Sequence, residues 1–242
     1  MNSGMIPPLV LSLFPGIGLL DMAFEEEGFC VVRGPDLLWG GDVRTFHPPA
    51  GKFDGVIGGP PCQAFSGLAN LQRGKGQEPS FGNLIPEFER CVCEAAPAWF
   101  VMENVRTAPV PSVDGYAVDS RVVQNRWFGE EQSRIRRVSF GTAGGHRLRI
   151  VGEVFMNPVF AQTVTAAHAG ERRVHGKKAT GGAIVRYSVE EAARLQGVEL
   201  SRFERCPFRR DALQKMLANG VPLPMGRAVA RAVKRAMHEA AA

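Results

Sequence analysis

The sequence predicts an α/β fold in which helices cover both faces of a mostly parallel β-sheet. Two observations support this prediction. Short apolar runs, typical of buried strands, alternate along the chain with segments of helical periodicity, as parallel strands joined by crossover helices do. The chain has 242 residues, 45% of them hydrophobic and 22% charged, which is enough for one such core in a soluble globular protein.

The expected strands and helices alternate from near the N-terminus. The first strand is expected at residues 9–14, followed by a helix at residues 19–27 with Gly28 as its stop. The polar, glycine-rich stretch 67–82 is expected to be a mobile loop. Further strands are expected at residues 29–32, 54–58, 99–102 and 137–140, and further helices at residues 84–95, 189–195 and 225–240.

Composition narrows the class of protein. No apolar run approaches the roughly 20 residues that span a bilayer, and residues 1–8 lack the regions of a signal peptide, so we expect no membrane association and a cytoplasmic location. Cys91 and Cys93 are too close together for a zinc knuckle, and no histidine cluster accompanies them, so no metal site is expected. The cysteines, odd in number and scattered, are expected to be reduced thiols: Cys30, Cys62, Cys91, Cys93 and Cys206.

The charge indicates a polyanionic partner only weakly. The formal net charge is +5, which many globular domains share. Arginines gather in residues 121–149, 172–178 and 202–210, and arginine is suited to bidentate phosphate contacts. Each stretch could instead be a solvated helix or loop face, and the sequence leaves both interpretations open.

The first predicted strand runs into a glycine turn, F-P-G-I-G at residues 14–18. Glycines in such a turn let the backbone approach a ligand closely, and the helix that follows offers free N–H groups. A purely structural tight turn would look the same. The third glycine of the dinucleotide fingerprint is missing, and Asp21 stands in its place, which favours a smaller adenosine compound over NAD.

The strongest signal follows the third predicted strand, where residues 58–66 read G-G-P-P-C-Q-A-F-S. The prolines stiffen this turn and the glycines permit an unusual backbone, so the thiol of Cys62 should be held at the strand end, facing a cleft. A thiolate there is a competent carbon nucleophile. An inert buried cysteine is the alternative, but it does not account for the whole nonapeptide.

Charged residues lie next to two more predicted strands. Glu103, in E-N-V at residues 103–105, follows the fourth strand and could act as a general acid toward a ring nitrogen, although alone it could be a solvated loop acid. Q-S-R-I-R at residues 132–136 places Arg134 and Arg136 at alternate positions entering a strand, so both side chains should point the same way. The alternative is an edge strand with solubilising charge. Segments that follow parallel strands should meet at one edge of the sheet.

In their order, these motifs resemble those of the C5-cytosine DNA methyltransferase family. The resemblance covers nearly the whole chain and implies a Rossmann-like, S-adenosylmethionine-dependent methyltransferase fold. It also implies S-adenosylmethionine as the cofactor, double-stranded DNA as the partner, and methylation of carbon 5 of a cytosine flipped out of the duplex. It rests on residues 14–18, 59–66, 103–105 and 132–136, on A-N-G-V-P at residues 218–222, and on residues 187–197, which resemble the structural motif before the family's C-terminal segment.

The resemblance also implies roles for single residues. Cys62 would attack C6 of the cytosine, and Glu103 would contact N3 and the exocyclic amine. Arg136 would approach the base oxygen and Arg134 would support the pocket; a water would then remove the C5 proton and Cys62 would be eliminated.

The same resemblance implies which residues meet the cofactor and the DNA. Asp42 would contact the adenine, and the loop carrying Arg73 and Lys75 would close over the DNA. The residues expected at the cofactor are Phe14, Gly16, Gly18, Leu19, Asp36, Asp42, Val43, Pro60, Asn219 and Val221. Those expected at the substrate are Gln63, Ser66, Arg73, Lys75, Asn104 and Gln132.

The chain departs from the family pattern on the adenosine side. The family usually has an acidic residue after the second strand to hold the ribose hydroxyls, and then a helix. Here R-G-P at residues 33–35 intervenes and Asp36 is the only candidate for the ribose. The helix before G-D-V at residues 41–43 is missing, so we expect a more open adenosine site.

The second departure concerns target recognition. Residues 158–166 already resemble the segment that closes the family's target-recognition domain, so only residues 142–157 are left for that domain, too few for an independent core. We therefore expect a vestigial domain and a short or relaxed target, bound mainly through phosphates. The expected division is a catalytic and cofactor-binding core at residues 1–142, a reduced target-recognition region at 143–182, and a C-terminal segment at 183–242 that returns to the core.

Two other functions stay open. One is methylation of cytosine in transfer RNA, because one branch of the family acts on RNA; A-F-S at residues 64–66 and the 132–136 motif resemble the DNA branch more. The other is a DNA-binding accessory subunit, against which the intact Cys62, Gln63 and Glu103 argue. A partner subunit or a homodimer could supply target recognition. Restriction–modification, phage defence against restriction and gene regulation, in a bacterial or phage-infected cell, are open roles.

Overall fold

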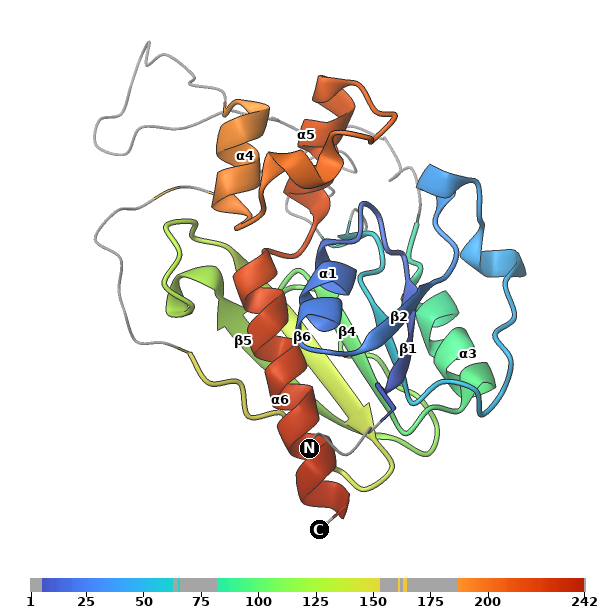
Figure 1. The fold of residues 1–242 in the computed structure, drawn as a ribbon. Coiled ribbons are helices and arrows are strands. Elements are labelled where there is room, and N and C mark those ends of the chain that lie inside the picture. Colours follow the sequence, from blue (N-terminus) through green and yellow to red (C-terminus); the bar gives the residue numbers. More distant parts are fainter. Residues whose placement is uncertain are drawn as a thin grey trace.

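In this computed structural model, the described residues are 6–62, 65, 82–152, 161, 163–164 and 187–241, with residue 241 described by its backbone alone. Within them, six strands form one sheet in the order β2-β1-β3-β4-β6-β5 (Figure 1). The first four strands of this order run parallel, whereas β6 pairs antiparallel with both β4 and β5. The strands are β1 (Leu9–Leu13), β2 (Cys30–Arg33), β3 (Gly55–Gly58), β4 (Trp99–Asn104), β5 (Ala117–Gln124) and β6 (Ile135–Thr142).

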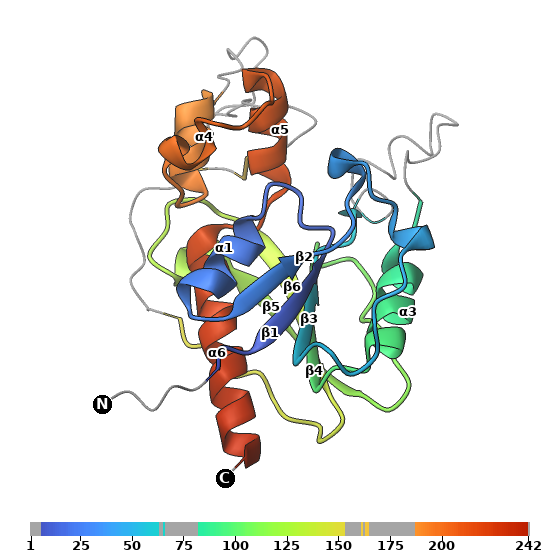
Figure 2. The same cartoon turned by 45° about the vertical axis from the view of Figure 1, so that its right-hand side comes forward.

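Helices cover both faces of this sheet. Alternate side chains of the strands point to opposite faces of the sheet. Helices α1 and α6 lie over one face and helix α3 over the other (Figure 2). Val10, Ile57 and Val101 pack with α1 and α6 on one face. Leu11 and Val56 pack with α3 on the other. The helices are α1 (Leu19–Glu26), α3 (Ile85–Ala95), α4 (Val189–Leu195), α5 (Arg210–Asn219) and α6 (Leu223–Ala241).

The fold predicted from the sequence is confirmed: an α/β fold with a mostly parallel sheet. The absence of a helix between β2 and β3 is also confirmed, since this stretch holds only two 3-10 turns, at Leu37–Trp39 and Val43–Thr45. The sequence analysis missed β5 and α5. The mixed sequence of β5 shows no clear alternation, because β5 is an edge strand that exposes much of its surface. The loop expected at 67–82 lies outside the described residues except for Gly82.

The short helices α4 and α5 form a separate layer beyond the carboxyl ends of the parallel strands (Figure 1). They have an apolar core of their own, which includes Leu195 and Leu217, and which also receives Leu19 of α1. The C-terminal chain therefore closes over the same edge of the sheet at which the sequence motifs end. Among the described helices, none has the length and apolar character that crossing a membrane would require.

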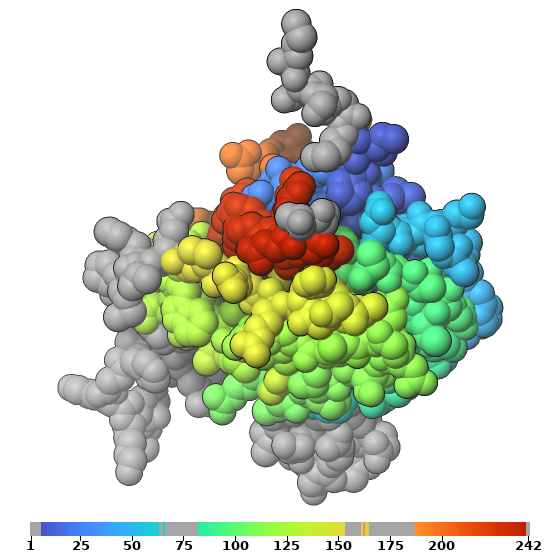
Figure 3. Space-filling view, turned by 90° about the horizontal axis from the view of Figure 1, so that it is seen from below, coloured from blue at the N-terminus to red at the C-terminus, as the bar shows by residue number. Residues whose placement is uncertain are grey.

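The described start of the 143–182 region turns back onto the core. The backbone amide of Leu148 donates to Asp119 of β5 at 2.9 Å, and Arg235 of α6 donates to the carbonyl of Arg149 at 2.9 Å. Seen from below, this segment lies beside α6 (Figure 3). Most of the predicted 143–182 region lies outside the described residues, so its division from the core stays a prediction.

Candidate active site

A cavity of about 490 Å³ opens at the carboxyl ends of the parallel strands. Its walls come from the segments that follow β1, β2, β3 and β4, from β6, and from the end of α5. All but one of the residues predicted at the cofactor line it: Phe14, Gly16, Leu19, Asp36, Asp42, Val43, Pro60, Asn219 and Val221. Cys62, Glu103, Asn104 and Arg136 line the same cavity. The convergence expected from the sequence is therefore found.

Gly18 is the exception, because it does not line the cavity. Its φ is +82°, and a Cβ atom there would lie 2.5 Å from the guanidinium of Arg33. Gly18 thus admits the Arg33 side chain over the start of α1, where Arg33 Nε lies 3.0 Å from a carboxylate oxygen of Asp21. The close approach to Gly18 in the structure comes from a side chain of the protein, and the predicted cofactor contact of Gly18 stays a prediction.

Asp21 is a buried acid at the inner end of the cavity that the sequence analysis noted but gave no role. Its carboxylate accepts a hydrogen bond from the Ser12 hydroxyl at 2.5 Å and faces Arg33. Burial nevertheless raises the pKa of Asp21 from 3.8 to about 6, against the lowering effects of Ser12 and Arg33. Its position in the first turn of α1, after the glycine turn, was the signal that could have placed it at the cavity.

An Asp21→Asn variant is expected to be stabilised relative to the wild type as the pH rises. Because the pKa is raised, the folded state binds the proton more tightly than the unfolded state does. The protonated acid therefore stabilises the wild type fully below pH about 4, and this stabilisation is lost as the pH rises through about 6. Asparagine imitates the protonated acid at every pH, so the free energy of unfolding of the variant should rise by about 3 kcal/mol relative to that of the wild type between pH 4 and pH 8. Urea unfolding at both pH values measures this difference. The exposed Asp114→Asn is the control; a pH-independent difference for Asp21→Asn would contradict the prediction.

Glu103 and Arg136 form an ion pair at the end of the sheet. Because β4 and β6 are antiparallel and Glu103 lies opposite Val138, Arg136 is its diagonal neighbour on the same face. Glu103 Oε1 and Arg136 Nε are 2.8 Å apart, and both side chains are largely buried. Of the two arginines expected to point the same way, only Arg136 lines the cavity. Arg134 is buried beside it, where it still acts on the charges of Cys62 and Glu103.

The thiol of Cys62 faces the same charges. Burial raises the pKa of Cys62 above its usual value of 9.0; Arg136 lowers it, Glu103 raises it and Arg134 lowers it. The balance favours a protonated thiol at neutral pH. A ligand that engages the negative charge of Glu103 would therefore favour the thiolate.

Asn104 holds the turn that carries Cys62. Its amide nitrogen donates to the carbonyl of Pro60 at 3.0 Å, and its side-chain oxygen accepts from the amide of Val105 at 2.8 Å. The side chain is buried and both of its ends are engaged by backbone. Asn104 therefore positions the cysteine turn, and its predicted substrate contact stays a prediction.

Arg134 and Gln132 are core residues and do not line the cavity. Arg134 donates to the carbonyl of Gly220 at 3.0 Å and to that of Val164 at 3.2 Å, which fits its expected supporting position. Gln132 donates to the carbonyl of Leu195 at 2.6 Å. The Gln132 amide is fully buried against the C-terminal segment, and the substrate contact predicted for it stays a prediction.

Arg90, which was not predicted as a site residue from the sequence, holds one wall of the cavity in place. Arg90 of α3 donates to the carbonyl of Val43 at 2.7 Å and to that of Phe46 at 3.1 Å, and it is held in turn by Glu87 and Glu94. It thereby fixes the 3-10 turn that carries Asp42 and Val43 to the cavity. Gln63, Ser66, Arg73 and Lys75 lie outside the described residues. In the described part of the chain, no cluster of His, Cys, Asp or Glu could hold a metal ion.

Comparison with known proteins identifies the family. The model of the family described as C-5 cytosine-specific DNA methylase matches residues 40–109. Type II methyltransferase M.HgiDI of Herpetosiphon aurantiacus is 28% identical over 166 residues, which are 56% of this chain and 52% of that protein. The chain thus spans about half the length of this relative. Type II methyltransferase M.HgiGI of the same organism is 30% identical over 124 residues, 43% of this chain and 94% of that protein.

A solved structure agrees at the level of the fold. The methyltransferase EhMeth of Entamoeba histolytica superposes with a TM-score of 0.68 at 11% identity, over 96% of this chain and 99% of that one. The fold, the match to the family model and the alignment, which covers 94% of M.HgiGI at 30% identity, all indicate the same family. This chain belongs to the C-5 cytosine-specific DNA methylase family.

Proposed function

We propose that this protein transfers a methyl group from S-adenosylmethionine to carbon 5 of cytosine in DNA, through a covalent adduct between Cys62 and a flipped-out base. The observation that carries the proposal is the shared cavity. One space of about 490 Å³ is lined both by the glycine turn after β1 and by Cys62, Glu103 and Arg136. Family membership supports the same reaction.

The cavity fits an adenosine-containing cofactor. Its volume is within the range of small-ligand sites. At Gly16 a Cβ atom would have no neighbour within 4 Å, so a ligand can approach this backbone directly. Asp36 and Asp42, which line the wall beyond it, offer carboxylate oxygens for hydroxyl and amine groups. When bound there, S-adenosylmethionine supplies an electrophilic methyl group.

Asp36 is the best candidate for the ribose, although it has a second task. One carboxylate oxygen accepts from the amide of Gly16 and the other from the amide of Leu38, both at 2.8 Å. Each oxygen has a further lone pair for a hydroxyl donor. Asp36 would thus bind the ribose while it also holds the glycine turn. In this chain it would take the position of the acidic residue that, in the family pattern, follows the second strand and precedes a helix.

The chemistry of the protein side chains follows from their positions. The Cys62 thiol would first lose its proton to water. Its sulfur would then form a bond to C6 of the cytosine, the electron pair of the C5–C6 double bond would move into the ring toward N3, and Glu103 would donate a proton to N3 while Arg136 at the base oxygen stabilises the charge. C5 would take the methyl group, with S-adenosylhomocysteine as the leaving group. Glu103 would recover the N3 proton, a water would remove the C5 proton, and the electron pair of that C–H bond would restore the C5–C6 double bond as the C6–sulfur bond breaks and releases the Cys62 thiolate.

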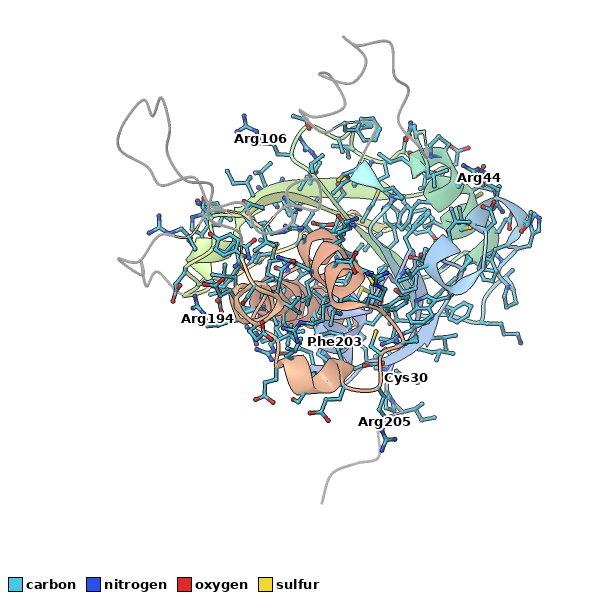
Figure 4. All side chains as sticks on the ribbon, turned by 90° about the horizontal axis from the view of Figure 1, so that it is seen from above. Cys30, Arg44, Arg106, Arg194, Phe203 and Arg205 are labelled. Carbon is cyan, nitrogen blue, oxygen red and sulfur yellow. The ribbon has the colours of Figure 1, made fainter. Side chains whose placement is uncertain are left out.

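Cytosine in duplex DNA is the proposed substrate, and exposed arginines surround the open edge of the sheet. Seen from above, Arg44, Arg106, Arg194 and Arg205 lie around the rim of this face (Figure 4). Such residues suit contacts with phosphates, which carry no sequence information. The described part of the 143–182 region folds back onto the core. This agrees with the inference from the sequence that few residues are left to contact base edges and so to recognise a target sequence.

Target choice is therefore expected to be short or relaxed. Bisulfite sequencing of DNA methylated by the purified protein should show methylation in many contexts. Affinity for duplex DNA should fall by about a hundredfold between 50 and 200 mM salt, as about four released counterions would give. A single long, strict recognition sequence would contradict this expectation.

The proposed function is tested by offering the purified protein two substrates. Labelled S-adenosylmethionine is incubated with duplex DNA and, separately, with transfer RNA, and the labelled product is digested to nucleosides. We expect 5-methylcytosine in the DNA. Label in RNA alone would favour the RNA branch of the family, and label in neither, unless a second protein is added, would favour an accessory subunit.

A further inference from the structure

Trp39 is a half-exposed indole that directly follows two cavity-lining residues and contacts two distant segments of the chain. The 3-10 turn Leu37–Trp39 follows β2, and its first two residues line the cavity. The Trp39 side chain is 51% exposed, although large aromatic residues usually bury more of their surface. Its contacts on the two sides explain why the indole is held there.

The first partner is the glycine turn. Phe14 and Gly16 both have left-handed backbone conformations, with φ of +55° and +56°, so this turn needs support from outside. Trp39 Nε1 donates to the carbonyl of Gly16 at 2.8 Å, while Asp36 accepts from the amide of Gly16 at 2.8 Å. The segment 36–39 thus holds both polar groups of Gly16.

The second partner belongs to the C-terminal chain. The Trp39 ring packs on Phe208, with centroids 5.1 Å apart and planes inclined at 58°. Phe208 lies two residues before α5, and α5 ends at Asn219, which lines the cavity together with Gly220 and Val221. Leu38 also packs against the apolar core of α4 and α5. The turn Leu37–Trp39 therefore contacts both the glycine turn and the segment that leads into α5.

We propose that Trp39 and Phe208 form a latch that joins the glycine turn to the segment before α5, and that Trp39 is a positioning residue for the cofactor. The latch holds the glycine turn and the C-terminal wall together around the ligand and slows its departure. It replaces the support that a helix after β2 would give. The inference rests on the proposed function for the identity of the ligand.

The test measures ligand binding, with S-adenosylhomocysteine as the probe. Trp39→Phe keeps a ring but removes the Nε1 donor, and Phe208→Leu removes the aromatic contact. Each variant is expected to raise the Kd about fivefold, as the loss of one such interaction would, mainly through faster dissociation. In methyl transfer, KM for S-adenosylmethionine should rise by a similar factor while kcat changes less than twofold.

Two variants serve as controls. Trp127→Phe changes a tryptophan that is equally exposed, at 49%, but does not line or border the cavity. Phe208→Tyr keeps the ring and should restore wild-type binding. A Kd and dissociation rate within twofold of the wild type in both Trp39→Phe and Phe208→Leu would overturn the latch while leaving the proposed function intact. Failure of the wild-type protein to bind S-adenosylhomocysteine at all would overturn the proposed function and the latch with it.

Discussion

A Cys62→Ser variant is expected to lose methyl transfer to DNA by at least about a thousandfold and to form no covalent adduct with DNA that contains 5-fluorocytosine. A serine hydroxyl is a far weaker nucleophile toward C6 than a thiolate. Fluorine at C5 cannot leave as the proton does, so the wild-type adduct should accumulate when S-adenosylmethionine is present. A shift in mobility on a denaturing gel reports the adduct.

The control for this prediction is Cys206→Ser. Cys206 is also partly buried, but it packs against the core of α4 and α5 and does not line the cavity. This variant should transfer methyl groups and form the adduct as the wild type does. An adduct in Cys62→Ser would mean that another residue is the nucleophile.

A Glu103→Gln variant is expected to change two properties in opposite directions. Methyl transfer should fall by about a hundredfold to ten-thousandfold, because the residue proposed to stabilise the attacked ring is lost. The pKa of Cys62 should fall, since the carboxylate of Glu103 raises it and Arg136 would then face the thiol without its carboxylate partner. At pH 7 more of the thiol would be ionised, so iodoacetamide should alkylate Cys62 faster.

The alkylation rate as a function of pH measures this shift. Mass spectrometry locates the label on Cys62, and an exposed Glu204→Gln variant is the control, with a wild-type profile expected. A Glu103→Gln profile that is unchanged, or displaced to higher pH, would show that Glu103 does not act on the thiol. A slow enzyme whose cysteine is more reactive is hard to explain by a general loss of structure.

Much of the site followed from the sequence because the fold places consecutive motifs together. Ligand-binding segments that follow parallel strands must meet at the carboxyl edge, so the turns at residues 14–18 and 59–62 and the end of β4 converge wherever the sheet forms. The candidate catalytic residues could be predicted for the same reason. Cys62 and Glu103 occur at strand ends, where the local backbone directs their side chains toward the cavity.

Contacts between distant parts of the chain could not be inferred in this way. Gln132 and Arg134 stand in one motif with Arg136, yet only Arg136 reaches the cavity, because the other two are covered by the C-terminal segment. Gly18 belongs to a ligand-binding turn in the sequence but is packed against Arg33. No local sequence pattern shows which distant segment of the chain will cover a given residue.

The sequence by itself therefore determined most of the strands and helices, though not β5 and α5, the edge at which the site forms and the nucleophile proposed for it. These depend on periodicity and on turns that a few neighbouring residues specify. Tertiary structure alone decided which motif residues face the cavity, how Asp21 comes to be buried beside it, and how Trp39 joins the glycine turn to the segment before α5. Those features arise from packing between segments far apart in the chain, and burial is what changes the pKa values of their charged groups.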